Sequence, residues 1–277
     1  CFTNSSRNLG NGTTGNNLSS FLHDNVGAYR QVVTLHRVSF CISDDDSTEA
    51  LSCICLKSVE PGKVDVCGLN GHQFAMVRFL NDELAAKLPA DGLLLQKKYV
   101  NELRKWLGTD EVMLNISERR FHLRTGSGSE TLSLPRSGFI YPDHLSFLSR
   151  LQAADASTLK LRRKECQESL DRLHIFNNES DRCTYFQFSP TEVTMSAQGQ
   201  ETGSATENLD VSFSGSLERI AFPTRNLIDI LGHFQSGELT FTLTGAEGPC
   251  GISGTEDPDY TFLIMPMKIA ETSYYEE

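Results

Sequence analysis

No stretch of the chain approaches the roughly 20 consecutive apolar residues that a membrane-spanning helix needs. The chain also has no phosphate-binding glycine loop, no dinucleotide-binding glycine fingerprint, no HExxH zinc motif and no nucleophile elbow. No CxxC pair occurs among its eight cysteines, and its seven histidines show no metal-ligand spacing. We therefore expect no enzyme, no metal site and no cofactor.

The composition is that of an ordinary globular protein. The 277 residues suffice for about two domains, and 39% hydrophobic with 22% charged residues fits a soluble fold. The net charge of −11 argues against a basic surface that grips nucleic acid tightly, but it leaves room for a local basic face. Cys53 and Cys55 lie in a strand-like run and would point to one face, as reduced buried thiols of a cytoplasmic protein.

Periodicity and turn residues predict an alternation of strands and a few helices. Residues 1–27, rich in Asn, Gly, Ser and Thr, are interpreted as a linker, and residues 29–40 fit either a strand or a helix. Asn70-Gly71 predicts a tight turn. Strands are expected at 50–57, 64–68, 74–80, 93–95, 112–117, 120–124, 131–134, 185–188, 192–195, 209–213, 220–222, 239–243 and 260–265, and helices at 97–107, 162–173 and 224–234.

Two segments repeat one order of elements. From Leu93 and again from Ile220 the chain shows a strand, a polar break, one amphipathic helix, a glycine and a strand, at an offset of 127 residues (220 − 93). Identity between the segments is low, but the order matches. We therefore predict an α+β fold made of two copies of one domain, each with two helices packed on antiparallel sheets of roughly eight strands.

The apolar strand near the C-terminus ends at Pro266, between Met265 and Met267. Proline cannot donate to a strand ladder, so the strand must stop there. Methionine is adaptable and common on surfaces that accept several partners. Two interpretations stay open, a core strand that simply ends and a hydrophobic pocket beside a strand end.

Three places carry a family resemblance: Gly71-His72 after a strand, Tyr141-Pro142-Asp143 near the middle, and the ending from Leu263 through Met-Pro-Met to Ile269. With them the chain resembles the second and third domains of the bacterial sliding clamp, the beta subunit of DNA polymerase III. The resemblance implies clamp domains at 28–152 and 153–269, with 1–27 as a linker or a remnant of a first clamp domain and 270–277 as a tail.

The resemblance implies a processivity factor without catalytic activity. Members of the family are head-to-tail homodimeric rings that enclose duplex DNA and tether the polymerase. Polymerase and clamp-loader subunits insert short peptides, with a glutamine and an apolar-aromatic end, between the second and third domains. By position, the pocket wall here would be Leu69, Gly71, His72, Gln73, Phe74, Pro142, Phe147, Leu263, Met265, Pro266 and Met267.

Twelve helices line the hole of such a ring, so basic residues on the helices would meet phosphates without reading bases. The alternative for each residue is an ordinary solvated helix face. The candidates are Lys97, Lys98, Arg104, Lys105, Arg162, Arg163, Lys164 and Arg225.

The chain departs from the family pattern at several positions. Leu69-Asn70-Gly71-His72-Gln73 stands where the family usually has Thr-Asp-Gly-His-Arg, and Ser146 stands where an arginine is common. The acidic tail, with Tyr274 and Tyr275, reaches toward the pocket or lies on the outer surface. Both positions of the tail are hypotheses.

Two other classes of function stay open. Asn-x-Ser/Thr sequons and the Asn/Gly/Thr-rich start suggest an extracellular β-rich adhesion or carbohydrate-binding module, which would contain disulfides. A structural protein that binds only other proteins is the third possibility.

Overall fold

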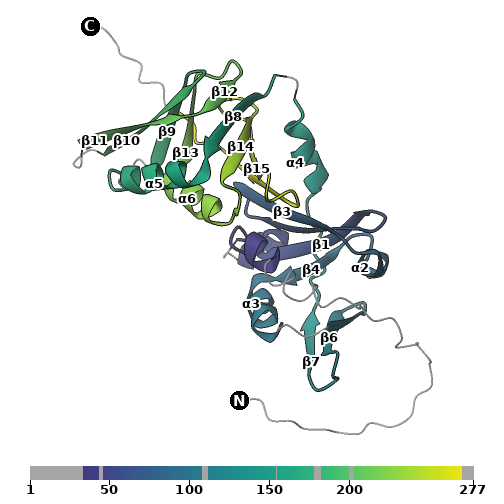
Figure 1. Ribbon diagram of the computed structural model, residues 1–277. Helices are drawn as coiled ribbons and strands as arrows, with labels where there is room; N and C mark the ends of the chain where they lie inside the picture. The colour runs from purple at the N-terminus through teal and green to yellow at the C-terminus, as the bar shows by residue number, and fades with distance from the viewer. Residues whose placement is uncertain are drawn as a thin grey trace, which may run out of the picture.

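The computed structural model describes residues 34–43, 46–107, 112–153, 155–177, 182–199 and 203–269. The expectations for 1–27 and for the tail 270–277 therefore lie outside the described residues. Figure 1 shows two halves that meet where β3 of the first half lies beside the last strands of the second half. The first half covers 34–153 and the second covers 155–269.

Among the described residues, the first half contains four α-helices, one 3-10 helix and seven strands. Residues 34–39 are helical, which decides for a helix in the described part of the segment 29–40. A 3-10 helix, η1 (Asp46–Ser52), precedes the first strand. The remaining elements are β1 (Cys53–Glu60), β2 (Lys63–Leu69), β3 (Gln73–Leu80), α2 (Asp82–Lys87), β4 (Leu93–Gln96), α3 (Lys97–Trp106), β5 (Val112–Ile116), β6 (Arg120–Thr125), β7 (Thr131–Pro135) and α4 (His144–Arg150).

The described part of the second half contains two helices and nine strands. Its elements are β8 (Ser157–Arg162), α5 (Arg163–His174), β9 (Cys183–Phe188), β10 (Glu192–Gly199), β11 (Gly203–Asp210), β12 (Ser212–Ser214), β13 (Arg219–Pro223), α6 (Thr224–Gly232), β14 (Glu238–Leu243), β15 (Cys250–Gly254) and β16 (Tyr260–Ile264).

One antiparallel sheet crosses the boundary between the halves. Its strand order is β12-β8-β14-β15-β16-β3-β2-β1-β4, and β16 pairs with β3 through partners such as Leu263 and Phe74. Each half adds a second sheet, β5-β6-β7 in the first and β11-β10-β9-β13 in the second. Because β16 and β3 share a hydrogen-bonded ladder, the two halves form one continuous structure.

Both faces of the central sheet are covered. Side chains alternate along a strand, so Ala75 and Val77 join the large core while Phe74 and Met76 join a smaller cluster on the opposite face. The smaller cluster packs against Phe147 on α4. This double burial explains why β3 has a continuous apolar sequence.

Four helices form a row on the large-core side of the molecule. Helix α5 contacts α6. His233, which follows α6, stacks on Phe40 at 3.9 Å, and His36 on the first helix lies 3.2 Å from Arg104 on α3. The order is therefore α5, α6, the helix at 34–39 and α3. Figure 1 shows this row on one side and α4 on the other.

The predicted repeat is confirmed in its details. Helix α3 starts at Lys97 and α6 starts at Thr224, which gives the offset of 127 residues (224 − 97) expected from the sequence. Each helix follows a short strand, β4 or β13, and leads into the next strand, β5 or β14. The predicted α+β fold with helices packed on antiparallel sheets is therefore confirmed.

Several local predictions were wrong. The strand expected from Ala50 begins at Cys53, because the preceding residues form η1. The strand expected at 209–213 is divided at Val211 between β11 and β12, which pair with different neighbours. The structure also contains β8, β15, α2 and α4, which the pattern did not predict.

The seven described cysteines, from Cys41 to Cys250, all carry buried thiols that form no disulfide. Cys53 and Cys55 do share one face of β1, and Cys67 on β2 joins them in the smaller cluster. Burial raises the pKa of the Cys55 thiol to about 12, so this thiol stays protonated near neutral pH. Among the described residues, no helix is long and apolar enough to cross a membrane.

Candidate functional site

A cavity of about 270 Å³ opens where the two halves meet. It lies beside the β3–β16 pair and is walled on its other side by Phe147 and Arg150 of α4. The full lining is Leu51, Leu69, Gly71, His72, Gln73, Phe74, Phe147, Arg150, Pro249, Leu263, Ile264 and Met265. The wall therefore combines residues separated by up to 214 positions in the sequence (265 − 51).

The turn between β2 and β3 forms one wall. Asn70 Oδ1 accepts hydrogen bonds from the backbone N–H of His72 at 3.0 Å and of Gln73 at 2.8 Å. Gly71 has φ of 90°, a conformation that L side chains rarely adopt. The Asn-Gly pair therefore closes the tight turn predicted from the sequence, and it exposes His72 at the rim.

The end of the last strand forms the second wall. Ile264 is the final residue of β16, and the backbone N–H of Met265 donates to the carbonyl oxygen of His72 at 2.8 Å. Pro266 has no N–H, so the ladder stops, as predicted. The N–H of Met267 then donates to Ala221 on β13 at 2.8 Å, which leads the chain away from the cavity.

A buried charged network holds the third wall, α4, in place. Asp65 on β2 is fully buried and binds Arg78 through two hydrogen bonds of 2.6 and 2.7 Å. His144 Nε2 lies 2.9 Å from Asp65 Oδ2, the oxygen that also accepts from Arg78 Nη2. Burial alone would raise the pKa of Asp65, but the hydrogen bonds from Arg78 and His144 outweigh it and lower the pKa.

The contact with Asp65 orients the start of α4, whose first turn is capped by Asp143. The ring of Phe147 then meets Phe74 edge-on at 5.9 Å between centroids. An edge-to-face pair of this kind fixes the relative position of both rings. The sheet and α4 therefore present a preformed apolar surface.

The structure brings together eight of the eleven residues expected in the pocket: Leu69, Gly71, His72, Gln73, Phe74, Phe147, Leu263 and Met265. Pro142, Pro266 and Met267 do not line the cavity, and Met267 is 45% exposed. Sequence reasoning missed Leu51, Arg150, Pro249 and Ile264. Ser146 stands where the family commonly has an arginine. The exposed Arg150 lies one helical turn after Ser146, so α4 carries an arginine near the cavity at another position.

The cavity suits an apolar ligand with a few polar groups. Leucine, isoleucine, phenylalanine and methionine side chains make up most of its lining, and His72 and Arg150 are the ionisable side chains at it. No carboxylate lies among the lining residues. A concave apolar surface with few oriented polar groups is typical of a ligand or peptide site.

The candidate DNA-facing residues lie on or beside the row of helices. They differ in whether the side chain is exposed or already bound to another group of the protein. Lys98 and Lys105 on α3 are exposed. Lys97 donates to the carbonyl oxygen of Ile42 at 3.0 Å, and Arg104 lies against His36. The charge of α3 comes from four basic residues and one acidic residue.

Helices α5 and α6 present a balanced surface instead. Arg162 pairs with Glu165 at 2.6 Å and Lys164 with Glu168 at 3.8 Å, while half-buried Arg163 donates to the carbonyl oxygen of Ser236 at 2.9 Å. Each of these helices carries as many acidic as basic side chains. Exposed Arg225 is one of the balanced charges of α6.

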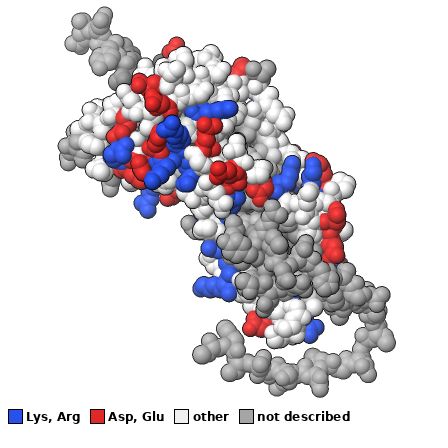
Figure 2. Space-filling view, in the orientation of Figure 1, with Lys and Arg blue, Asp and Glu red and all other residues white. Residues whose placement is uncertain are grey.

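Figure 2 shows Lys and Arg interspersed with Asp and Glu over the second half. The excess positive charge of the row is therefore on α3. Among the basic residues expected to face DNA, Arg163 instead binds the backbone carbonyl oxygen of Ser236 and stabilises the fold.

Comparison with known proteins gives a family match over the second half of the chain. The profile described as "DNA polymerase III beta subunit, C-terminal domain" matches residues 153–268. The beta sliding clamp of Caulobacter vibrioides is 22% identical over 240 residues, which cover 85% of this chain and 63% of that protein. That of Chlamydia muridarum is 26% identical over 233 residues, which cover 84% of this chain and 61% of that protein.

Solved structures agree on the fold. A DnaN sliding clamp from Pseudomonas aeruginosa, crystallised bound to griselimycin, superposes with a TM-score of 0.77 at 22% identity, covering 87% of this chain and 64% of that one. The chain thus spans less than two thirds of the relatives it matches. Residues 153–268 thus match the C-terminal domain of the DNA polymerase III beta subunit family, within a chain that has the fold of the sliding clamps.

Proposed function

We propose that the chain supplies the second and third domains of a DNA sliding clamp, with domains at 28–152 and 153–269. In this role it surrounds duplex DNA without reading its sequence and tethers a polymerase and clamp-loader subunits. It acts in the cytoplasm as a processivity factor and catalyses no reaction of its own. The observation that carries the proposal is the apolar cavity at the junction of two repeats of the clamp fold.

The pocket is the proposed tether. A partner peptide with a glutamine and an apolar-aromatic end would place its apolar side chains against Phe74, Phe147 and Leu263. Two or three such anchors contribute about 2 kcal/mol each before the cost of ordering the peptide, which is the larger part of the roughly 8 kcal/mol that micromolar binding requires. Such affinity lets one partner replace another.

The row of helices is the proposed DNA-facing surface. Lys98 and Lys105 give it a local positive field, whereas the ion pairs on α5 reduce the field there. A few phosphate contacts produce weak, salt-sensitive attraction, which suits a protein that slides. The strong net negative charge elsewhere would repel DNA from other surfaces.

In the full-length protein, rather than for these 277 residues alone, a second copy would complete the ring at the far end of the second half. Strand β11 pairs with β10 alone among the described strands, and Ile175 after α5 is 73% exposed. Arg172 on α5 connects this helix to the edge strand β11 by donating two hydrogen bonds of 2.8 Å to Glu207.

In sedimentation of the intact gene product, Ile175→Asp should convert dimer to monomer, and an unchanged mass would refute this interface.

Peptide binding tests the tether. A fluorescent Gln-x-x-Leu-Phe peptide should bind the chain with micromolar affinity, and Met265→Ala and Phe147→Ala should each weaken it by roughly tenfold or more. Both side chains are half-buried, so the fold should survive. The matched controls are Met113→Ala and Phe139→Ala, which lie outside the cavity. Pocket variants that bind as tightly as the parent would refute the assignment.

A further inference from the structure

The sheet β5-β6-β7 has a basic outer face that the proposed clamp function does not use. Along β6, Phe121 and Leu123 are buried in the large core, so the alternating residues Arg120, His122 and Arg124 stand on the opposite face. Arg120 and Arg124 are exposed and His122 is half-buried. Since α3 packs on the core side, this face points away from the row of helices.

The neighbouring strands add polar and neutral side chains to the same face. His122 is paired with Asn115 on β5 and with Ser133 on β7, and Arg124 is paired with Met113 and Thr131. Pairs directly opposite in a ladder project to the same side. Among the described residues of the three strands, this face therefore carries no carboxylate.

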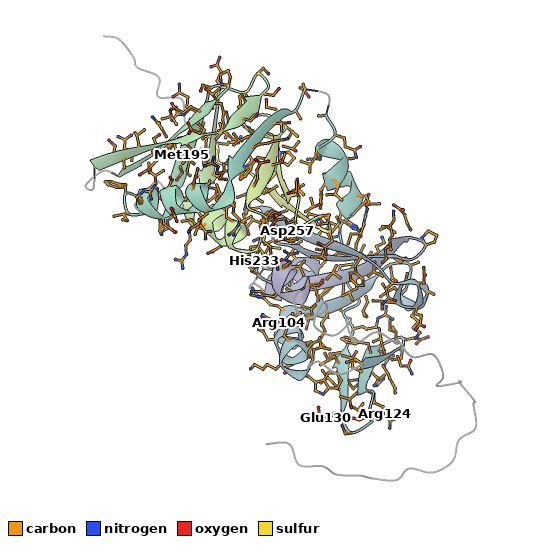
Figure 3. The ribbon with its side chains drawn as sticks, in the orientation of Figure 1. Arg104, Arg124, Glu130, Met195, His233 and Asp257 are labelled. Atoms are coloured by element: carbon orange, nitrogen blue, oxygen red, sulfur yellow. The ribbon has the colours of Figure 1, made fainter. Side chains whose placement is uncertain are left out.

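Glu130, the residue before β7, is assigned to the other face by its backbone pairing. Thr125 donates its N–H to the carbonyl oxygen of Glu130, so these two residues lie opposite each other in the hairpin. Thr125 is on the core face, one residue after Arg124. Figure 3 shows Arg124 and Glu130 together at the outer end of the hairpin.

One arginine is already held in position. Arg120 Nε donates to Ser133 Oγ at 2.8 Å and Nη2 donates to the Ser133 carbonyl oxygen at 2.8 Å. The second terminal nitrogen, Nη1, keeps its two N–H groups for a partner. Because the side chain is ordered before binding, a partner would lose less entropy in meeting it.

We propose that this face, formed by Arg120, His122 and Arg124 with the flanking Asn115, Thr131 and Ser133, binds an extended acidic segment of a protein. Alternate residues on a strand are about 6.6 Å apart, and alternate carboxylates of an extended peptide repeat at the same spacing. Arginine pairs well with carboxylates, and the hydroxyl and amide groups beside it add hydrogen bonds.

Single-stranded nucleic acid fits this face less well. Sites for it combine positive charge with aromatic side chains on which bases stack. The strand positions of this face hold no phenylalanine, tyrosine or tryptophan. Charge complementarity without a stacking platform therefore favours a carboxylate-rich peptide over an oligonucleotide.

The test measures anisotropy of a fluorescent peptide of alternating serine and glutamate, which lacks the apolar motif proposed for the pocket. The intact chain should bind it saturably at low salt, and Arg120→Gln/Arg124→Gln should weaken binding about tenfold. The control Lys160→Gln/Arg219→Gln removes two exposed cations elsewhere and should leave binding unchanged. Arg124→Gln alone, which spares the Ser133 contacts, should give about a threefold loss.

Three results would overturn the proposal. They are the absence of saturable binding, an equal loss in the control variant, and tighter binding of an oligothymidylate through the same arginines. Since the probe does not use the junction cavity, failure here would leave the pocket proposal standing, and failure of the pocket would leave this one standing.

Discussion

His144 and Asp65 form a buried hydrogen bond of 2.9 Å that fastens α4 to β2. The carboxylate is shared with Arg78, so one charged group connects two strands of the central sheet to the helix that walls the cavity. Removing one member of a buried charged network leaves the others without a partner. Asp65 is therefore a positioning residue for the pocket although it does not line it.

Replacement of Asp65 should uncouple α4 from the sheet. We expect Asp65→Ala to lower the free energy of unfolding by about 3 kcal/mol and to weaken binding of the pocket peptide, because Phe147 loses its fixed position. Urea unfolding and peptide anisotropy measure the two effects. The control Glu60→Ala breaks only the exposed pair with Lys63 and should change stability far less. Equal losses would contradict this role.

The surface charge of α3 should dominate attraction to DNA. Lys98→Gln/Lys105→Gln should reduce the slope of log affinity against log salt for duplex DNA by about 2, since two phosphate contacts are lost. Arg162→Gln/Lys164→Gln removes the same charge but from pairs with Glu165 and Glu168, so it should change the slope little. Equal slopes for the two double variants would refute the assignment.

His233 should make stability depend on pH. Burial, with the charges of His36 and Arg37, lowers its pKa to about 4. An unfolded histidine titrates near 6.5, so its contribution is full above about pH 6.5 and is lost as the pH falls toward 4. His233→Phe can keep the stacking on Phe40 and cannot bind a proton.

The unfolding free energy of His233→Phe should therefore fall less than that of the parent between pH 7 and 5 in urea titrations. His174→Gln, which changes an exposed histidine, is the control and should follow the parent. A variant that loses as much stability as the parent over this range would show that His233 is not the group responsible.

The junction should depend on Asp257, which meets Arg37 from the other half in a buried ion pair. The carboxylate also accepts the backbone N–H groups of Gln235 at 2.9 Å and Ser236 at 2.8 Å. Figure 3 shows Asp257 near His233 at this junction. We expect Asp257→Ala to cost about 3–5 kcal/mol in urea unfolding, against under about 1 kcal/mol for exposed Asp210→Ala. A small loss would contradict a structural role for the pair.

Local sequence signals predicted the repeated elements well. The amphipathic helices starting at Lys97 and Thr224 have strong apolar stripes, and the Asn70-Gly71 turn has a side chain that caps its own backbone. Such features depend on neighbours in the sequence and are visible without the fold. The pocket residues came instead from the family resemblance.

The missed elements depend on distant contacts. Helix α4 is short, and its first residue, His144, is held by Asp65, which is 79 positions away. Strand β15 contains two glycines, Gly251 and Gly254, and is ordered by its neighbours β14 and β16. Arg163 continues a basic run in the sequence, yet only the fold brings it to the carbonyl oxygen of Ser236. Propensity alone could not show these contacts.

Hydrogen exchange of the chain with and without the Gln-x-x-Leu-Phe peptide tests the central claim most directly, because it locates the bound peptide without any mutation. The account predicts protection at residues 69–74, 147–150 and 263–265, where the cavity is lined. Protection confined to other segments, or no change at saturating peptide, would contradict a partner-binding pocket at the junction.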